Sequence, residues 1–285
     1  MAPVRTVPGL APRFCTDQST YTRAVPAVRC EPEEQVAVIT LDRPEARNAV
    51  NREMALGIEA AVDRLEADPD LRVGVLCANT AEQAKAVFCA GADLKVVRET
   101  GSAAALDTDR GGFAGFVFRE RTKPIVAAVD GLATAGGLEI VLACDVVVAS
   151  TRASFGLAEV RHNLVAAAGG LYRLPRAIGR AAAMDAILTG EPIEARRAYD
   201  LGLVSRLVEP GAALAEAMRV ARAIVAAAPL AVHASRRAVL MATSEPDDVL
   251  RATTRSMLDA LFETDDTAEG LRAFAEKRAP QWQGR

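Results

Sequence analysis

The segment Asp130-Gly-Leu-Ala-Thr-Ala-Gly-Gly-Leu-Glu139 follows the apolar run Pro124–Val129 and ends on a carboxylate. Its adjacent glycines, Gly136 and Gly137, carry no side chain, so the backbone N–H groups there can approach a ligand closely. The segment therefore predicts a strand, a glycine turn and a helix built around a small-molecule site.

Two further segments have the same character. Glu159 ends the short apolar run Ala153-Ser-Phe-Gly-Leu-Ala-Glu159, and Phe88-Cys-Ala-Gly-Ala-Asp-Leu-Lys95 contains a second glycine turn. Two carboxylates and two turns with donating amides are the groups needed for proton transfer beside a stabilised oxyanion. We therefore expect Glu139 and Glu159 to share one catalytic site.

The composition excludes several classes of partner. The chain has 285 residues, is 51% hydrophobic and 25% charged, and carries a net charge of −3. This near-neutral charge provides no general attraction to nucleic acid or anionic membranes. No apolar run reaches the ~18–20 residues of a membrane span. We expect a soluble protein with neither a nucleic-acid nor a membrane partner.

The cysteines and histidines argue against a metal site. The five cysteines are odd in number, lack CxxC spacing, and are joined by only two histidines. We expect reduced thiols, a cytoplasmic location, no structural zinc and no resident cofactor. Residues 1–30 contain four prolines but no apolar core of a signal peptide, so we interpret them as a flexible N-terminal extension.

Hydrophobic patterning predicts an α/β core followed by helices. Strands are expected at 36–41, 72–77, 124–129, 146–149 and 204–208. Helices are expected at 51–68, with Asn51 as cap, and at 136–144, 170–178, 180–189, 194–202, 211–227, 230–243, 247–263 and 267–278. Residues 31–208 form the core and 209–285 the helical region. The phenylalanine-containing stretch 98–121 is predicted to be a mobile lid over an apolar pocket.

Taken together, these segments resemble the crotonase family, the enoyl-CoA hydratase/isomerase superfamily, over roughly residues 34–285. The matching segments, in the family's order, are Leu41–Ala49, Phe88–Lys95, Ala127–Glu139, Cys144-Asp145, Gly169-Gly170, Leu188–Gly190, Ala198 with Gly202–Val204, and Glu269-Gly270 with Phe274–Arg278. The resemblance implies a spiral of ββα repeats that forms two roughly perpendicular sheets. It also implies C-terminal helices that assemble a homotrimer or a dimer of trimers.

The resemblance further implies an acyl-CoA thioester substrate and an oxyanion hole made by the backbone N–H groups of Ala92 and Gly136. Glu139 and Glu159 match the two acids of the hydratase branch, which adds water to a trans-2-enoyl-CoA in fatty-acid β-oxidation. We assign Glu139 to positioning and deprotonating the water and Glu159 to protonating the α-carbon. Because such a pair titrates as a coupled unit, the division of roles stays open.

Residues that contact CoA are also implied by the resemblance. They fall into a nucleotide group, a group around the pantetheine and adenine, and a group from a neighbouring subunit's C-terminal helix. These are respectively Glu45, Ala46 and Asn48; Ala90, Asp93, Leu94 and Lys95; and Phe274 and Lys277.

Alternative interpretations remain. The same scaffold suits a carnitinyl-CoA-type dehydratase, an enoyl-CoA isomerase, or a non-catalytic acyl-CoA-binding or RNA-binding relative. Ala158 and the segment 161–168 depart from the hydratase pattern at the acyl end, which leaves the substrate more open than the reaction. His162 is interpreted as a pocket-lining or surface residue, and Cys144-Asp145 as packing with a helix-end hydrogen bond.

Overall fold

The computed structural model describes residues 26–81 and 83–285, so most of the predicted extension, residues 1–25, lies outside the described residues. A six-stranded sheet runs through the centre of the molecule in the order β1-β2-β3-β7-β9-β12. Only β1 is antiparallel to its neighbour; the other pairs are parallel. The strands are β1 Val28–Glu33, β2 Val36–Leu41, β3 Val73–Ala78, β7 Ile125–Val129, β9 Val146–Ser150 and β12 Arg206–Val208.

A second sheet of four short strands has the order β11-β10-β8-β4. Its strands are β4 Val87–Cys89, β8 Leu132–Thr134, β10 Ser154–Gly156 and β11 Ile193–Glu194. Each of β3, β7 and β9 in the large sheet is followed directly by β4, β8 or β10 in the small one. This alternation, with helices after the second strand, is the ββα repeat predicted from the resemblance.

Helix α1, Arg52–Ala67, shows why the large sheet is covered on one face. Asn51 begins it by accepting a hydrogen bond from the Met54 amide at 2.9 Å, as predicted. Met54, Ile58, Val62 and Leu65 are fully buried, because their spacing of three and four residues places them on one side of the helix. Helix α7, Ala213–Val225, packs its alanine-rich face on β3, β7 and β9 through a separate cluster.

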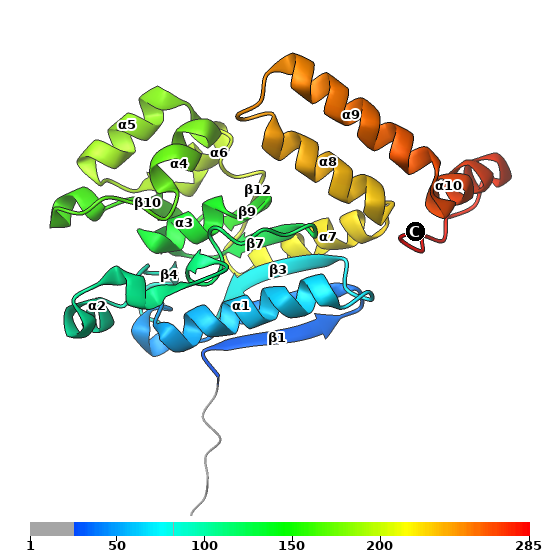
Figure 1. Cartoon of the computed structure of the whole chain (residues 1–285). Coiled ribbons are helices and arrows are strands. Elements are labelled where there is room, and N and C mark those ends of the chain that lie inside the picture. Colours follow the sequence, from blue (N-terminus) through cyan, green and yellow to red (C-terminus); the bar gives the residue numbers. More distant parts are fainter. Residues whose placement is uncertain (1–25, 82) are drawn as a thin grey trace, which may run out of the picture.

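Except for α2, where no helix was predicted, the remaining helices follow the predicted ranges closely. They are α2 Leu94–Thr100, α3 Gly136–Leu142, α4 Gly170–Ile178, α5 Arg180–Thr189, α6 Ala195–Asp200, α8 Pro229–Met241, α9 Asp247–Phe262 and α10 Asp265–Glu276. The helical region after residue 208 is confirmed, and its α9 and α10 extend away from the sheets (Figure 1).

Two sequence expectations need correction. β1 begins at Val28 and pairs along its whole length with β2, so the chain enters the sheet before the predicted end of the extension at residue 30. The predicted lid, 98–121, contains the end of α2, the short helix η2 (Ala103–Leu106) and the hairpin β5-β6 (Asp107–Thr108 and Gly112–Phe113). Phe113 and Phe116 are buried in the core, whereas Phe118 is exposed.

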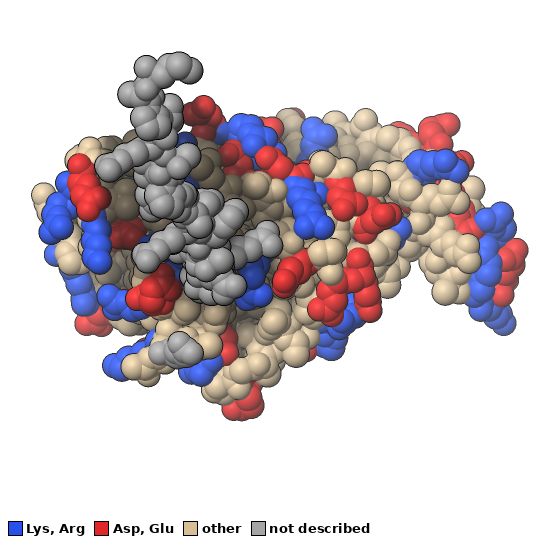
Figure 2. Space-filling model, turned by 90° about the horizontal axis from the view of Figure 1, so that it is seen from below, with Lys and Arg blue, Asp and Glu red and all other residues tan. Residues whose placement is uncertain are grey.

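Charged residues on the surface are mixed. On the face shown in Figure 2, outside the grey atoms, Lys and Arg alternate with Asp and Glu without gathering by sign.

No single helix of the described residues is both long and apolar enough to cross a membrane. Helices α7 and α8 reach the length and apolar composition of a membrane span only when they are counted together, and the chain bends by 111° between them.

Asp145 fastens the helical region to the core. Its carboxylate accepts hydrogen bonds from the Ile125 amide (2.8 Å), from Arg121 (2.5 Å) and from Arg236 of α8 (2.8 Å). Arg236 also donates to the Arg121 carbonyl at 2.6 Å. The side chains of Arg121 and Arg236 are only 3% and 14% exposed. Both guanidinium groups therefore depend on this one carboxylate for a negative charge inside the protein. The interpretation of Asp145 as a structural residue is confirmed.

Asp145→Ala should lower the free energy of unfolding by about 3–5 kcal/mol, because it leaves two largely buried cations without their anion. Urea denaturation measures this, with Asp200→Ala as the control. Asp200 pairs with Arg196 on an exposed helix face, and its removal should cost less than about 0.5 kcal/mol. Equal losses in the two variants would contradict the anchoring role.

Candidate active site

The two predicted glycine turns meet between the small sheet and α3. Gly91 follows β4 with φ of 86°, and a Cβ there would lie 2.9 Å from the Gly136 amide nitrogen. A Cβ on Gly137 would lie 2.1 Å from the carbonyl oxygen of Cys89. Real side chains do not tolerate such distances, so glycine is what allows the start of α3 to rest on the end of β4. The structure thus brings Phe88–Lys95 against Asp130–Glu139.

Two backbone amides are left without a protein acceptor at this contact. The Gly91 carbonyl accepts from the Val50 amide at 2.7 Å and the Asp93 amide donates to the Val50 carbonyl at 2.9 Å, so the Ala92 amide between them points the other way. Gly136 is the first residue of α3, where no acceptor exists within the helix. Within the described part of the chain neither amide donates a hydrogen bond. These are the two amides predicted to form the oxyanion hole.

Glu139 projects from the first turn of α3 into the interior. Its side chain is almost wholly buried, with the residue 4% exposed, and Oε1 accepts a hydrogen bond from the Gly170 amide at 2.9 Å. Burial raises the pKa of this carboxyl to about 7; the amides of Gly170 and Ala168 oppose the rise, and the charge of Glu159 adds to it. A carboxyl with a pKa near neutrality can both take and return a proton at physiological pH.

Glu159 begins the short helix η3, Glu159–His162, directly after β10. Its Oε2 is buried and, within the described residues, has no hydrogen-bond partner. Burial also raises the pKa of Glu159, while the nearby charge of His162 lowers it. The charge of Glu159 adds to the rise in the pKa of Glu139, so the two carboxyls are close enough to interact. His162 is exposed, which agrees with its interpretation as a surface residue.

The predicted CoA-contacting segments 43–48 and 90–95 lie side by side. The Ala90 amide donates to the Arg47 carbonyl at 3.1 Å, and Arg43 forms an ion pair with Asp93 at 3.3 Å. Asp93 also caps α2 by accepting from the Lys95 amide. Of the predicted residues, Glu45, Leu94 and Lys95 are exposed and Ala46, Ala90 and Asp93 are half-buried. A cavity of about 410 Å³ lined by Arg43, Pro44 and Glu45 adjoins them.

The prediction for Asn48 needs correction at the level of its side chain. Asn48 is fully buried, its Oδ1 accepts from the Arg43 amide at 2.9 Å, and its Nδ2 donates to the carbonyls of Asn79 and Val87. With its amide satisfied inside the protein, the side chain cannot also contact a ligand. Asn48 instead fixes the loop that carries Glu45 and Ala46.

Phe274 and Lys277 lie outside this cluster. Both are on or next to α10, where Phe274 is 87% exposed and Lys277 is exposed. In Figure 1, α10 lies at the end of the molecule opposite α2. A single chain therefore does not bring these two residues to the glutamates.

The thiols near the site are not nucleophiles. Burial raises the pKa of Cys89 to about 12 and that of Cys144 to about 12, so both are neutral at physiological pH.

No group of three or more His, Cys, Asp and Glu side chains in the described residues is placed to hold a metal ion. A larger cavity of about 610 Å³ lies between the ends of β2 and β3 and the start of α7, and neither glutamate lines it.

Two features of the site were missed from the sequence. One is the Gly170 amide, which donates a hydrogen bond to Glu139. The only sequence signal for it is the glycine pair Gly169-Gly170, which indicates a helix start with free backbone N–H groups. Arg173 lies one turn further along α4 and its charge lowers the pKa of Glu139. The sequence pattern of α4 does not show that Arg173 is partly buried whereas Arg176, on the same helix, is exposed.

The family model described as enoyl-CoA hydratase/isomerase matches residues 31–285. The chain belongs to the enoyl-CoA hydratase/isomerase family, the crotonases. It is 40% identical over 257 residues to (E)-benzylidenesuccinyl-CoA hydratase from Thauera aromatica, covering 90% of this chain and 99% of that protein. It is 37% identical over 251 residues to carnitinyl-CoA dehydratase from Salmonella arizonae, covering 86% and 94%.

The crotonase fold is confirmed by solved structures. That of enoyl-CoA hydratase from Mycobacterium tuberculosis superimposes with a TM-score of 0.85 at 41% identity, covering 92% of this chain and all of that one. At this similarity the chain is a crotonase of the hydratase and lyase type that takes an acyl-CoA thioester. The relatives' names differ in the acyl group, which is the part of the substrate that the sequence left open.

Glu139→Gln should change how this crotonase's stability depends on pH. A folded-state pKa raised above the unfolded value stabilises the fold below about pH 4.5, and that contribution is lost as pH rises through about 7. The uncharged glutamine removes this dependence, so the variant should gain on the order of 3 kcal/mol relative to the parent between about pH 4 and pH 8. Thermal midpoints across that range measure it.

Glu191→Gln is the matched control, because Glu191 is exposed and its variant should follow the parent at every pH. If Glu139→Gln also followed the parent, Glu139 would not be buried in the way described.

Proposed function

We propose that this crotonase is an enoyl-CoA hydratase, which adds water reversibly to a trans-2-enoyl-CoA and gives the 3-hydroxyacyl-CoA. The single observation that supports the proposal is the pairing of the buried Glu139 carboxyl and the half-buried Glu159 carboxyl with two amides that have no acceptor among the described residues, at the meeting point of two glycine turns. An isomerase that only moves a proton needs a single carboxyl, whereas hydration takes a proton from the water that attacks C3 and delivers a proton to C2.

The amides of Ala92 and Gly136 would receive the thioester oxygen. As water adds to C3, the C2–C3 π electrons move toward the thioester and the oxygen takes on enolate charge. Donors fixed in advance by the Gly91–Gly136 contact stabilise that charge without reorganising, and one such donor contributes on the order of 3–4 kcal/mol. The first-turn position of Gly136 adds the favourable end of the helix dipole.

The glutamates would handle the protons. One carboxylate holds the water and takes its proton as the C–O bond forms, and the other carboxylic acid gives its proton to C2. We assign Glu139 to the water, because its Oε1 is fixed by Gly170 and its pKa of about 7 suits a base. Glu159, with an unpartnered buried oxygen, would supply the proton. The addition leaves Glu139 protonated and Glu159 ionised, and the starting states return when Glu139 releases its proton and Glu159 takes one up from solvent.

The segments 43–48 and 90–95 would hold the CoA moiety, with Lys95 near a phosphate. Phe274 and Lys277 would be supplied by a neighbouring copy, in a homotrimer or a dimer of trimers. Their exposure on α10, far from α2 of the same chain, supports this arrangement. A physiological role in β-oxidation is part of the same proposal.

The purified protein should hydrate crotonyl-CoA, with loss of the enoyl thioester absorbance and formation of the 3-hydroxyacyl product. A panel of longer, branched and carboxylate-bearing enoyl-CoA esters would rank the acyl groups by kcat/KM. Conversion of a 3-enoyl-CoA without hydration would favour an isomerase, and preference for carnitinyl-CoA would favour the dehydratase alternative. Failure to hydrate any 2-enoyl-CoA would refute the proposal.

Glu139→Gln and Glu159→Gln should each lower kcat by at least ~10², the usual size of a general acid–base contribution. CoA-ester binding, measured by calorimetry, should stay close to that of the parent, since neither change touches the CoA-binding segments. Glu191→Gln again serves as the control, with parent-like kcat. Parent-like turnover in either active-site variant would contradict the assignment.

A further inference from the structure

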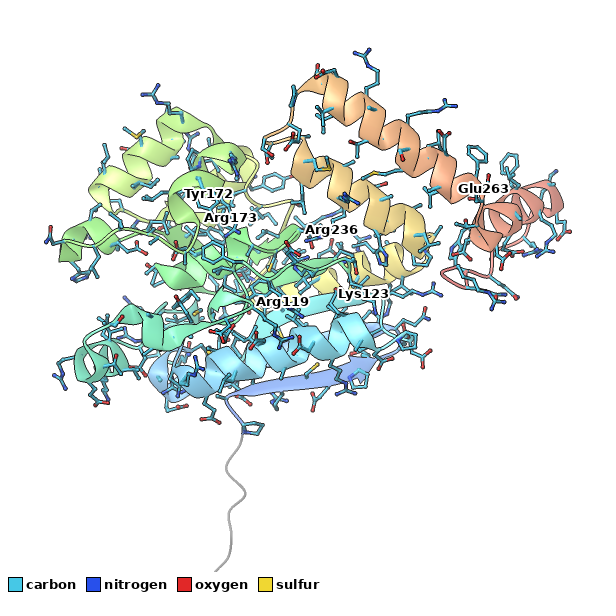
Figure 3. The ribbon with its side chains drawn as sticks, in the orientation of Figure 1. Arg119, Lys123, Tyr172, Arg173, Arg236 and Glu263 are labelled. Atoms are coloured by element: carbon cyan, nitrogen blue, oxygen red, sulfur yellow. The ribbon has the colours of Figure 1, made fainter. Side chains whose placement is uncertain are left out.

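Arg173 contacts the main chain of two loops, one containing Ala168 and the other Val117. Its Nη1 donates to the Ala168 carbonyl at 3.2 Å and its Nη2 to the Val117 carbonyl at 2.6 Å. Tyr172 and Arg173 lie together on α4 (Figure 3). The guanidinium carbon is 5.7 Å from the Phe118 ring centre and 5.3 Å from that of Tyr172. Arg173 therefore joins segments more than fifty residues apart in sequence.

One of these loops supports the catalytic carboxyl. The backbone amides of Ala168 and Gly170 both act on Glu139, and the Gly170 amide bonds its Oε1 at 2.9 Å. Arg173 holds the carbonyl of the same Ala168. A shift of this loop would move the donors that orient Glu139.

The other loop supports the predicted oxyanion hole. The amides of Phe116 and Val117 bond the Phe113 carbonyl, at 3.2 and 3.3 Å, which makes residues 113–117 a compact turn. The Phe113 ring lies directly on Gly136, since a Cβ at Gly136 would be 2.4 Å from its Cε1. Holding the Val117 carbonyl therefore holds the ring against the Gly136 backbone.

We propose that Arg173 is a positioning residue of the active centre, clamping the turn 113–117 and the segment 168–170 at a fixed separation so that the Gly136 amide and the Glu139 carboxyl keep their relative placement. The inference rests on the proposed hydratase function. A planar guanidinium suits this task, because it directs two N–H groups at two carbonyls in a rigid fork. A lysine at the same position has the charge but not the fork.

The electrostatic surroundings give the clamp a second effect. Among the described residues, the titratable groups whose charges act on Glu139 are Glu159 from η3 and Arg173 from α4. Arg173 itself faces Tyr172, Arg121 and Arg176. As the one cation among the groups facing Glu139, Arg173 lowers the pKa of that carboxyl, and its removal should raise it.

The test compares Arg173→Gln and Arg173→Lys with Arg176→Gln. Arg176 lies on the same helix and also faces the Tyr172 ring, at 5.4 Å, but is exposed. Both Arg173 variants should lose ~10–100-fold in kcat on crotonyl-CoA, as misplacement of catalytic groups typically produces, with KM changed less than about threefold. Arg173→Gln should also move the acidic limb of the kcat profile to higher pH, whereas Arg173→Lys should leave it in place. Arg176→Gln should match the parent in both.

A measurement that needs no activity separates this inference from the proposed function. The pKa of Glu139 can be read from a carbon-13 carboxyl titration, with its signal assigned by its loss in Glu139→Gln. It should rise in Arg173→Gln and not in Arg176→Gln, even if no enoyl-CoA is hydrated. If Arg173→Gln does not fold, Arg173→Lys still tests the clamp through kcat. Parent-like kcat in Arg173→Lys, or an unmoved Glu139 pKa in Arg173→Gln, would overturn the inference.

Discussion

The contact between the backbones of Gly91 and Gly136 is the constraint on which the active centre depends. A single Cβ on Gly91 would come within 2.9 Å of the Gly136 amide, so the small sheet and α3 can meet there only without side chains. The contact brings together two amides that have no acceptor in the described chain. It also fixes the start of α3, and Glu139 is one turn further along that helix. This one backbone contact thus sets the packing of α3 on the small sheet, the placement of the two amides and the position of the Glu139 carboxyl.

Burial of Glu139 links stability to chemistry. Removing a carboxylate from water disfavours its charge, and the resulting pKa of about 7 is a cost to the fold at neutral pH. The same shift gives a base that can exchange its proton under physiological conditions. The Gly170 amide and the Arg173 charge moderate the cost, which keeps the carboxyl ionisable inside the protein.

Most of the fold was predictable from the sequence, and the failures have physical causes. The large-sheet strands after β1 and the long helices have runs with clear periodicity, and their bounds agree with prediction to within a few residues. Strands such as Ser154–Gly156 are too short to show a period, and β1 is polar and partly exposed. Glu139 and Glu159 could be recognised because glycines or a small apolar run precede them. Arg173 could not, because only the tertiary contacts of α4 distinguish it from Arg176.

The most direct test of this active-site arrangement is a crystal structure with an unreactive CoA thioester that has the acyl shape of a 2-enoyl group. In that structure the thioester oxygen should lie within hydrogen-bonding distance, roughly 2.7–3.2 Å, of both the Ala92 and the Gly136 amide nitrogens. The carboxyls of Glu139 and Glu159 should face the carbons equivalent to C2 and C3. A thioester bound away from either amide, or carboxyls turned from those carbons, would contradict it.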